Sequence, residues 1–162
     1  MKLQTNTYLA LYSVLEFAAQ PERHVSAAEI ADKYGVSAHH LAKVLSELAR
    51  IGILESVRGA GGGYRFAGNA RRLTLMDIIQ TFEGASVPDG SRREPGDPTP
   101  VGRALGVVLS EIDEIAKATF SSITLETMLR LIDRQQASAS TPARRTARGK
   151  AAPSRERHSV RQ

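Results

Sequence analysis

The chain contains no cysteine, and this absence removes a wide range of chemistry. It excludes disulfide bonds, metal ligation by thiolates and thiol redox reactions. Long apolar runs are missing too, because charged residues interrupt each hydrophobic stretch well before the roughly 20 residues that span a bilayer. The N-terminus lacks the apolar segment of a signal peptide. We therefore expect a cytoplasmic protein that makes no membrane contact.

The motifs of common enzymes are also absent. The sequence has no cysteine nucleophile, no Gly-x-Ser-x-Gly elbow and no pair of histidines at metal-binding spacing. His39 and His40 are adjacent, so their side chains on a helix diverge by about 100° and do not chelate one ion together. His24 and His158 are isolated in the sequence, which is typical of surface histidines. We expect no enzyme activity, no metal site and no bound cofactor.

Positive charge is concentrated at one end of the chain. The formal net charge is +5, but residues 137–162 hold seven Lys/Arg against the single Glu156, whereas residues 1–136 hold 15 basic and 16 acidic residues. Within that larger part, residues 1–75 carry nine basic and six acidic residues. A mildly basic N-terminal half followed by an acidic middle suits a protein that meets nucleic-acid phosphates through one surface.

Three amphipathic helices are predicted near the N-terminus. The first covers residues 5–20. Ser26 is placed to cap the second helix, in a capping box with a glutamate three positions later, and Gly35 closes it. Ser37 is placed to cap the third helix, over 38–51, whose apolar stripe consists of Leu41, Val44, Leu45 and Leu48. A short helix, a tight turn with glycine and a longer helix together indicate a helix-turn-helix.

A β-hairpin is predicted directly after these helices. Residues 53–57 and 64–66 have strand character, and the segment between them, residues 58–63, contains four glycines and Arg58. In this position the hairpin would be the wing of a winged helix, where glycines let the backbone approach phosphates and an arginine enters a minor groove. The alternative, a phosphate-binding loop of an enzyme, requires Gly-Lys-Ser/Thr at the start of a helix, and an extended segment follows instead.

The rest of the chain alternates between helix and loop. A fourth helix is predicted from Thr74 to Gly84, an apolar helix suited to dimerisation over 101–120, and a further helix from about Thr124. The fold class is thus mainly α with a small β-hairpin. We divide the chain into a winged helix-turn-helix DNA-binding domain (1–84), a proline-rich loop (85–100), a dimerisation helix with a terminal helix (101–134) and a disordered basic tail (135–162).

Three stretches carry a family resemblance: Val36 to Leu41, Ile53 to Arg65 with its Val-Arg-Gly-Ala-Gly-Gly-Gly-Tyr-Arg run, and Leu75 to Gly84. They closely resemble the Rrf2 family of winged-helix regulators, which includes the IscR and NsrR types. The likeness extends from the first residue to about Ile132, and the glycine-rich run is its most specific part.

This resemblance implies a cytoplasmic homodimer whose long helices pack together and whose two heads bind a palindromic operator, usually to repress transcription. Many family members bind an iron-sulfur cluster through three cysteines in the loop before the dimer helix. The corresponding loop, residues 85–100, contains none, and Tyr8 occupies a position where some relatives supply a carboxylate ligand. A cysteine-ligated cluster is therefore excluded here.

The third helix and the hairpin supply the candidate DNA contacts. The apolar stripe of the third helix faces the core, and its polar residues are therefore on the outside. The N-terminal part of this helix would meet base edges, Arg58 a minor groove, and Arg65 a phosphate. Helix N-termini also favour phosphates through their backbone N–H groups. The predicted DNA-binding residues are Ser26, Ser37, His39, His40, Lys43, Arg50, Arg58, Gly59, Gly61 and Arg65.

Two questions stay open at the level of sequence. A protein-interaction module that kept the winged-helix fold but lost operator specificity is the alternative to a regulator. In that case the polar residues of the third helix are ordinary surface residues and the two serines are helix caps. An unidentified small-molecule effector is a further option, and its predicted pocket lies where the hairpin, residues 85–100 and the dimerisation helix meet.

Overall fold

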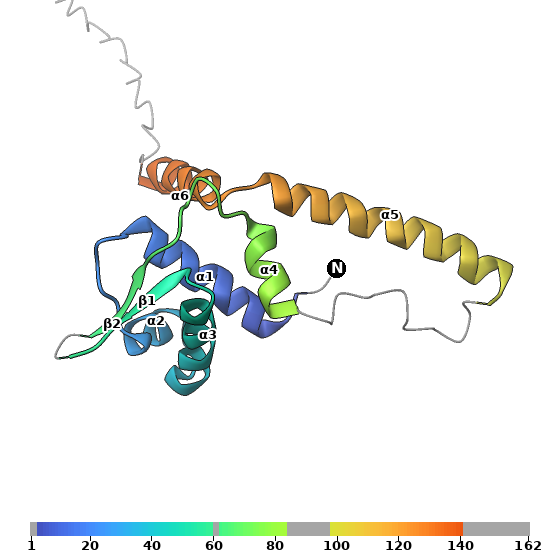
Figure 1. Cartoon of the computed structure of the whole chain (residues 1–162). Helices are drawn as coiled ribbons and strands as arrows, with labels where there is room; N and C mark the ends of the chain where they lie inside the picture. Colours follow the sequence, from blue (N-terminus) through green and yellow to red (C-terminus); the bar gives the residue numbers. More distant parts are fainter. Residues whose placement is uncertain (1–2, 60–61, 84–97, 141–162) are drawn as a thin grey trace, which may run out of the picture.

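The computed structural model describes residues 3–59, 62–83 and 98–140 (Figure 1). Within these ranges the chain forms helices and one two-stranded antiparallel sheet, which confirms the predicted mainly helical fold with a small hairpin. The elements are α1 (Thr5–Ala19), α2 (Ala27–Tyr34), α3 (Ala38–Arg50), β1 (Leu54–Val57), β2 (Gly63–Phe66), α4 (Leu75–Glu83), α5 (Pro100–Ser122) and α6 (Leu125–Ser140). No helix in these ranges is long and apolar enough to span a bilayer.

Side-chain caps fix where most of the described helices begin, α1 being an exception. The Ser26 hydroxyl accepts a hydrogen bond from the Glu29 N–H at 3.2 Å, and Gly35 closes α2 with a left-handed φ of 63°. At α4 the cap is reciprocal: the Asp77 carboxylate accepts from the Thr74 N–H at 2.7 Å, and the Thr74 hydroxyl accepts from the Asp77 N–H at 3.3 Å. These local bonds are readable from residue spacing, so the helix starts agree closely with the prediction.

We call α1 to α4 together with the hairpin the head of the protein. Its core lies between α1, α3 and α4. The four residues of the predicted α3 stripe are all buried, and they meet Phe17 of α1 and Ile78 and Ile79 of α4 in one apolar cluster. Leu125, the first residue of α6, is also fully buried in it. Burial of each such side chain contributes about 1.5–3 kcal/mol to stability. The first turn of α6 is therefore part of the head.

The hairpin is fastened to the helices by backbone hydrogen bonds. The Val25 N–H donates to the Tyr64 carbonyl at 3.0 Å, and the Tyr64 N–H donates to the Val25 carbonyl at 2.9 Å. Gly63 is needed beside this bridge, because a Cβ at that position would lie 2.5 Å from the Val25 carbonyl oxygen. The Tyr64 ring then meets Phe17 edge-on, with ring centroids 6.5 Å apart. The hairpin is thus tied to the segment that leads into α2.

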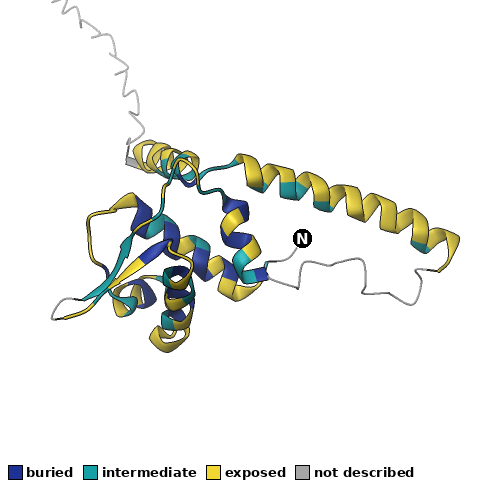
Figure 2. Cartoon of the chain, in the orientation of Figure 1, coloured by how far each residue is buried: buried dark blue, intermediate teal, exposed yellow. Residues whose placement is uncertain are grey.

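α6 is attached to the head, whereas α5 extends away from it. α6 is anchored to α4 by hydrogen bonds from the Leu75 N–H to the Ile123 carbonyl and from the Leu125 N–H to the Leu73 carbonyl, both 2.9 Å. α5 has no buried residue, and Figures 1 and 2 show it extending away from the head as an exposed rod. Most of the large apolar side chains on this rod therefore lack cover in the single chain.

Two predicted boundaries need correction. α5 begins at Pro100, inside the predicted loop 85–100, because Thr99 caps it and proline is favoured in the first turn. α6 continues to Ser140, although disorder was predicted from residue 135. Glutamine and alanine are adequate helix formers, and extending an anchored helix costs far less than nucleating one. The predicted helix end at Gly84, most of that loop and residues 141–162 lie outside the described residues.

A buried carboxylate joins the end of α4 to the start of α1. Glu83 is buried, and its Oε1 accepts from the Thr7 hydroxyl at 2.5 Å and from the Gln4 N–H at 2.8 Å. Thr7 is itself fully buried. Hydrogen bonds to a carboxylate are stronger than those between neutral groups, and a buried acceptor that loses its donor is costly. This contact had no signal in the sequence.

We predict that Thr7→Val lowers the free energy of unfolding by about 1–3 kcal/mol, because it keeps the shape of the side chain but leaves the buried Glu83 oxygen short of a donor. Thr81→Val is the matched control, since among the described residues the Thr81 hydroxyl bonds to the Asp77 carbonyl, one turn earlier in its own helix. The control should change stability by no more than about 0.5 kcal/mol. Urea unfolding followed by circular dichroism measures both; equal losses in the two variants would contradict the role given to Glu83.

Candidate nucleic-acid interface

The polar face of α3 is open to solvent. Its exposed residues include His39, Lys43 and Arg50, which with their neighbours line a shallow depression along the helix. The apolar stripe holds the opposite face in the core, and the helix period therefore turns these side chains outward. The structure thus brings four predicted residues, His39, His40, Lys43 and Arg50, onto one helix surface.

The hairpin stands beside this helix. Tyr64 of β2 links the two elements, because its hydroxyl lies 3.4 Å from the Ser46 hydroxyl of α3 while its backbone pairs with Val25. In Figure 1, α2 and α3 lie on one side of α1, whereas α5 and α6 lie on the other. The helix and the hairpin are thus neighbours in the fold.

The tip of the hairpin carries an exposed arginine on a tight glycine turn. Arg58 follows the last residue of β1 and is exposed. Gly59 has a left-handed φ of 117°, and its carbonyl accepts from the Gly62 N–H at 2.9 Å. A Cβ on Gly62 would lie 2.5 Å from the Val57 carbonyl oxygen. The turn therefore depends on glycine for its geometry, while Gly61, another predicted site residue, lies outside the described residues.

The predicted cations differ in what they contact. Arg50 donates to both carboxylate oxygens of Glu47, at 2.9 and 2.5 Å, and Arg65 donates to Glu55 across the hairpin. These hydrogen bonds hold the pKa of each glutamate below its usual range. No ion pair within the described residues involves Lys43 or Arg58.

The remaining predicted residues have structural contacts of their own. The His40 Nε2 lies 2.7 Å from Oδ1 of Asn6, at the start of α1. The hydroxyls of Ser26 and Ser37 cap α2 and α3 by accepting from backbone N–H groups. Capping leaves other N–H groups of each first turn facing solvent, so the cap and a phosphate contact are compatible.

Sequence reasoning missed three partners of these residues. The Glu47–Arg50 pair has a signal, because residues three apart on a helix are neighbours. Glu55 faces Arg65 only because of the strand register, in which Leu54 opposes Phe66. The approach of Asn6 to His40 joins residues far apart in the chain, and no local pattern indicates it.

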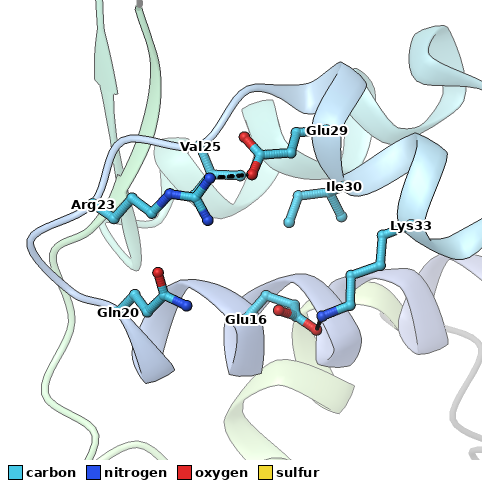
Figure 3. A pocket seen from close by; sticks show the side chains of 7 residues that line it. All are labelled: Glu16, Gln20, Arg23, Val25, Glu29, Ile30 and Lys33. Atoms are coloured by element: carbon cyan, nitrogen blue, oxygen red, sulfur yellow. Dashed lines mark hydrogen bonds and ion pairs between the residues drawn. The ribbon is translucent and has the colours of Figure 1, made fainter.

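A small hollow of about 110 Å³ lies between α1 and α2 (Figure 3). Two ion pairs cross it: the Lys33 Nζ lies 2.5 Å from Oε1 of Glu16, and Arg23 meets Glu29. Burial alone would raise the pKa of Glu16, but hydrogen bonds from Lys33 and Tyr34 outweigh it and lower that pKa. These charged groups are paired with each other. The two ion pairs therefore help to hold α2 and the loop before it against α1. The effector pocket predicted beside residues 85–100 falls largely outside the described residues.

Comparison with known proteins places this geometry in a family. The family Rrf2, described as iron-dependent transcriptional regulators, matches residues 3–131. A Rhodopseudomonas palustris protein named as an HTH-type transcriptional regulator, BadM, is 49% identical over 149 residues, which cover 92% of this chain and 90% of the relative.

Solved structures show the same fold. CymR (YrzC) of B. subtilis, titled the global cysteine regulator, has 30% identity and a TM-score of 0.65, and the match covers 81% of this chain and 98% of CymR. IscR of T. potens has 26% identity and a TM-score of 0.66, with 88% of this chain and 94% of IscR covered. The predicted winged-helix fold is confirmed.

The iron in the family description does not fit this chain as a cysteine-ligated cluster. The sequence supplies no thiolate, and within the described residues no three His, Cys, Asp or Glu side chains gather to hold a metal ion. Tyr8 is exposed on α1 and offers no carboxylate at that position. We therefore derive no function that depends on such a cluster.

The match over residues 3–131 and the identity with BadM confirm both the resemblance seen in the sequence and the expectation that the protein is not an enzyme. The chain belongs to the Rrf2 family of helix-turn-helix transcriptional regulators.

Proposed function

We propose that the protein is a homodimeric, cytoplasmic repressor that binds a palindromic operator through α3 and the hairpin of each protomer. The observation that carries this proposal is the position of the hairpin. The Val25–Tyr64 bridge ties it to the segment before α2, the Tyr64 hydroxyl lies beside Ser46 of α3, and Arg58 is exposed at its tip. One element suited to a major groove and one suited to a neighbouring minor groove are thus presented together.

Each proposed contact follows from position and chemistry. His39 and Lys43 lie toward the N-terminal half of α3, where side chains can donate to purine N7 or guanine O6. His40 lies beside them and is oriented by Asn6. Arg58, which precedes Gly59 and Gly61 in the turn, would enter the minor groove, because a glycine turn lets the backbone come close to phosphates. Arg50, Arg65 and the first turns after Ser26 and Ser37 would contact phosphates.

The proposed dimer rests on the exposed apolar face of α5. Five of its residues recur at helical spacing along one side, and each is more than half exposed: Val101, Leu105, Val108, Ile112 and Ile115. Contiguous apolar patches of this kind mark interaction surfaces, because their exposure to water is unfavourable. Pairing with a second copy would cover the stripe and set two heads about one DNA turn apart, as a palindromic site requires.

We predict that Arg58→Ala weakens operator binding by about 1–3 kcal/mol, because the arginine would lose its contact to base edges in the minor groove. Arg130→Ala is the control: it also removes one exposed arginine, but from α6, where Arg130 pairs with Glu126. Gel-shift titration with the chain's own upstream DNA, at fixed salt, measures both. The proposal predicts a two-fold symmetric footprint that the control preserves, whereas a protein-interaction module without operator specificity would give no footprint.

We predict that Ile112→Glu raises the dimer dissociation constant at least about 30-fold, since burying an unpaired carboxylate in an apolar interface costs several kcal/mol. Ser110→Glu places the same charge about 160° away around α5, on its polar face, and should leave the dimer intact. Sedimentation velocity over a range of concentrations distinguishes the two variants. Dimers of unchanged affinity in both would remove α5 from the proposed interface.

A further inference from the structure

Two of the four Lys and Arg side chains on the α3 and hairpin surface are held by glutamates of the same surface. Arg50 makes a two-pronged contact with Glu47, one turn earlier on α3. Arg65 pairs with Glu55, directly opposite it in the strand register. The other two cations, Lys43 and Arg58, have no carboxylate partner among the described residues. The surface is therefore divided between free and paired cations.

The pairing limits what the two arginines offer to DNA. Glu47 occupies both Nε and one terminal nitrogen of Arg50, the fork that would otherwise grip a phosphate. The Nε of Arg65 is enclosed by protein atoms without a partner, which leaves its terminal nitrogens, and Nη2 is bonded to Glu55. A phosphate must displace a carboxylate to reach the same donors, and that carboxylate also repels it.

We propose that Glu47 and Glu55 are specificity-determining residues that withhold Arg50 and Arg65 from the phosphates of non-operator DNA. This inference rests on the proposed DNA-binding function. Exposed ion pairs are weak, so they yield when base contacts hold the head firmly in register on an operator. On other sequences the phosphates are less well placed, and the arginines stay with their glutamates. The carboxylates thus lower non-specific affinity more than operator affinity.

A different role for Glu47 makes the opposite prediction. A glutamate on the outer face of a recognition helix can accept a hydrogen bond from cytosine N4, which would make it a direct reader of sequence. Both of its oxygens are already bonded to Arg50, which favours the withholding role. Direct reading would make Glu47→Gln weaken operator binding and leave non-specific binding unchanged.

The test uses Glu47→Gln and Glu55→Gln in the full chain, with Glu114→Gln as control. Glu114 also pairs with a cation three residues away, Lys117, but lies on α5, and its loss changes the net charge equally. Fluorescence anisotropy with a non-operator duplex of about 30 base pairs, three helical turns, is recorded over a range of salt concentrations. The same titrations are repeated with the DNA protected in the footprint.

We expect each of the two variants to bind the non-operator duplex about two- to fivefold more tightly than the parent chain. The plot of log K against log salt should steepen by about 0.9 for each arginine released. Adding Arg50→Ala to Glu47→Gln should abolish the gain from the latter. Operator affinity should rise less, so the ratio of operator to non-operator affinity falls.

Three results would overturn the inference: gains no larger than that of Glu114→Gln, a gain that survives Arg50→Ala, or the loss of operator binding expected for a base reader. The non-operator titration needs no operator, so its outcome is separate from that of the footprint. If the variants show the predicted gains in non-specific binding but no footprint is found, the operator proposal is rejected. The role of the glutamates as competitors for phosphate is retained in that case.

Discussion

The antiparallel backbone bridge between Val25 and Tyr64 is the constraint on which the surface proposed to face DNA depends. It turns a two-stranded hairpin, which would be marginal by itself, into an extension of the segment that leads into α2. Tyr64 then contributes a second time through its side chain, which reaches Phe17 in the core and Ser46 on α3. The recognition helix and the hairpin tip consequently have a fixed relation that neither element specifies alone. Gly63 is part of this constraint, because no side chain fits against the Val25 carbonyl.

Charge on this head is arranged locally, in pairs. The N-terminal half holds nine basic and six acidic residues, and four of the acidic residues, Glu16, Glu29, Glu47 and Glu55, pair with basic residues of the same half. Two of these pairs fasten α1 to α2 or brace the loop before α2, and two lie on α3 and the hairpin. The small net charge is therefore lower than the positive charge that this half can present when an ion pair opens. A surface of this kind favours selective binding over general attraction to phosphate.

The parts of the fold that follow from neighbouring residues could be predicted from the sequence, and those that depend on distant ones could not. Caps at Ser26 and Ser37, the α3 stripe and the glycine turn are all encoded within a few residues, and they emerged at the predicted places. The Glu83–Thr7 contact requires α4 to end against α1, which only the packed core determines. The pairing of Glu55 with Arg65 requires the register of the hairpin. Composition also misplaced the end of α6, because a helix anchored by Leu125 can extend through residues that would not start one.

The first turn of α1 makes polar contacts with both α4 and α3, in addition to the apolar core that these helices share. Glu83 reaches it from the end of α4 through Gln4 and Thr7, and Asn6, between those two residues, reaches the exposed His40 of α3. One helical turn therefore contacts both the end of α4 and the exposed side of α3, through two short sets of hydrogen bonds. Glu83 is the last residue of α4, so the contact fixes the end of that helix against the start of α1. These hydrogen bonds hold the end of α4, the start of α1 and α3 together through oxygen and nitrogen groups alone, in a chain that has no cysteine.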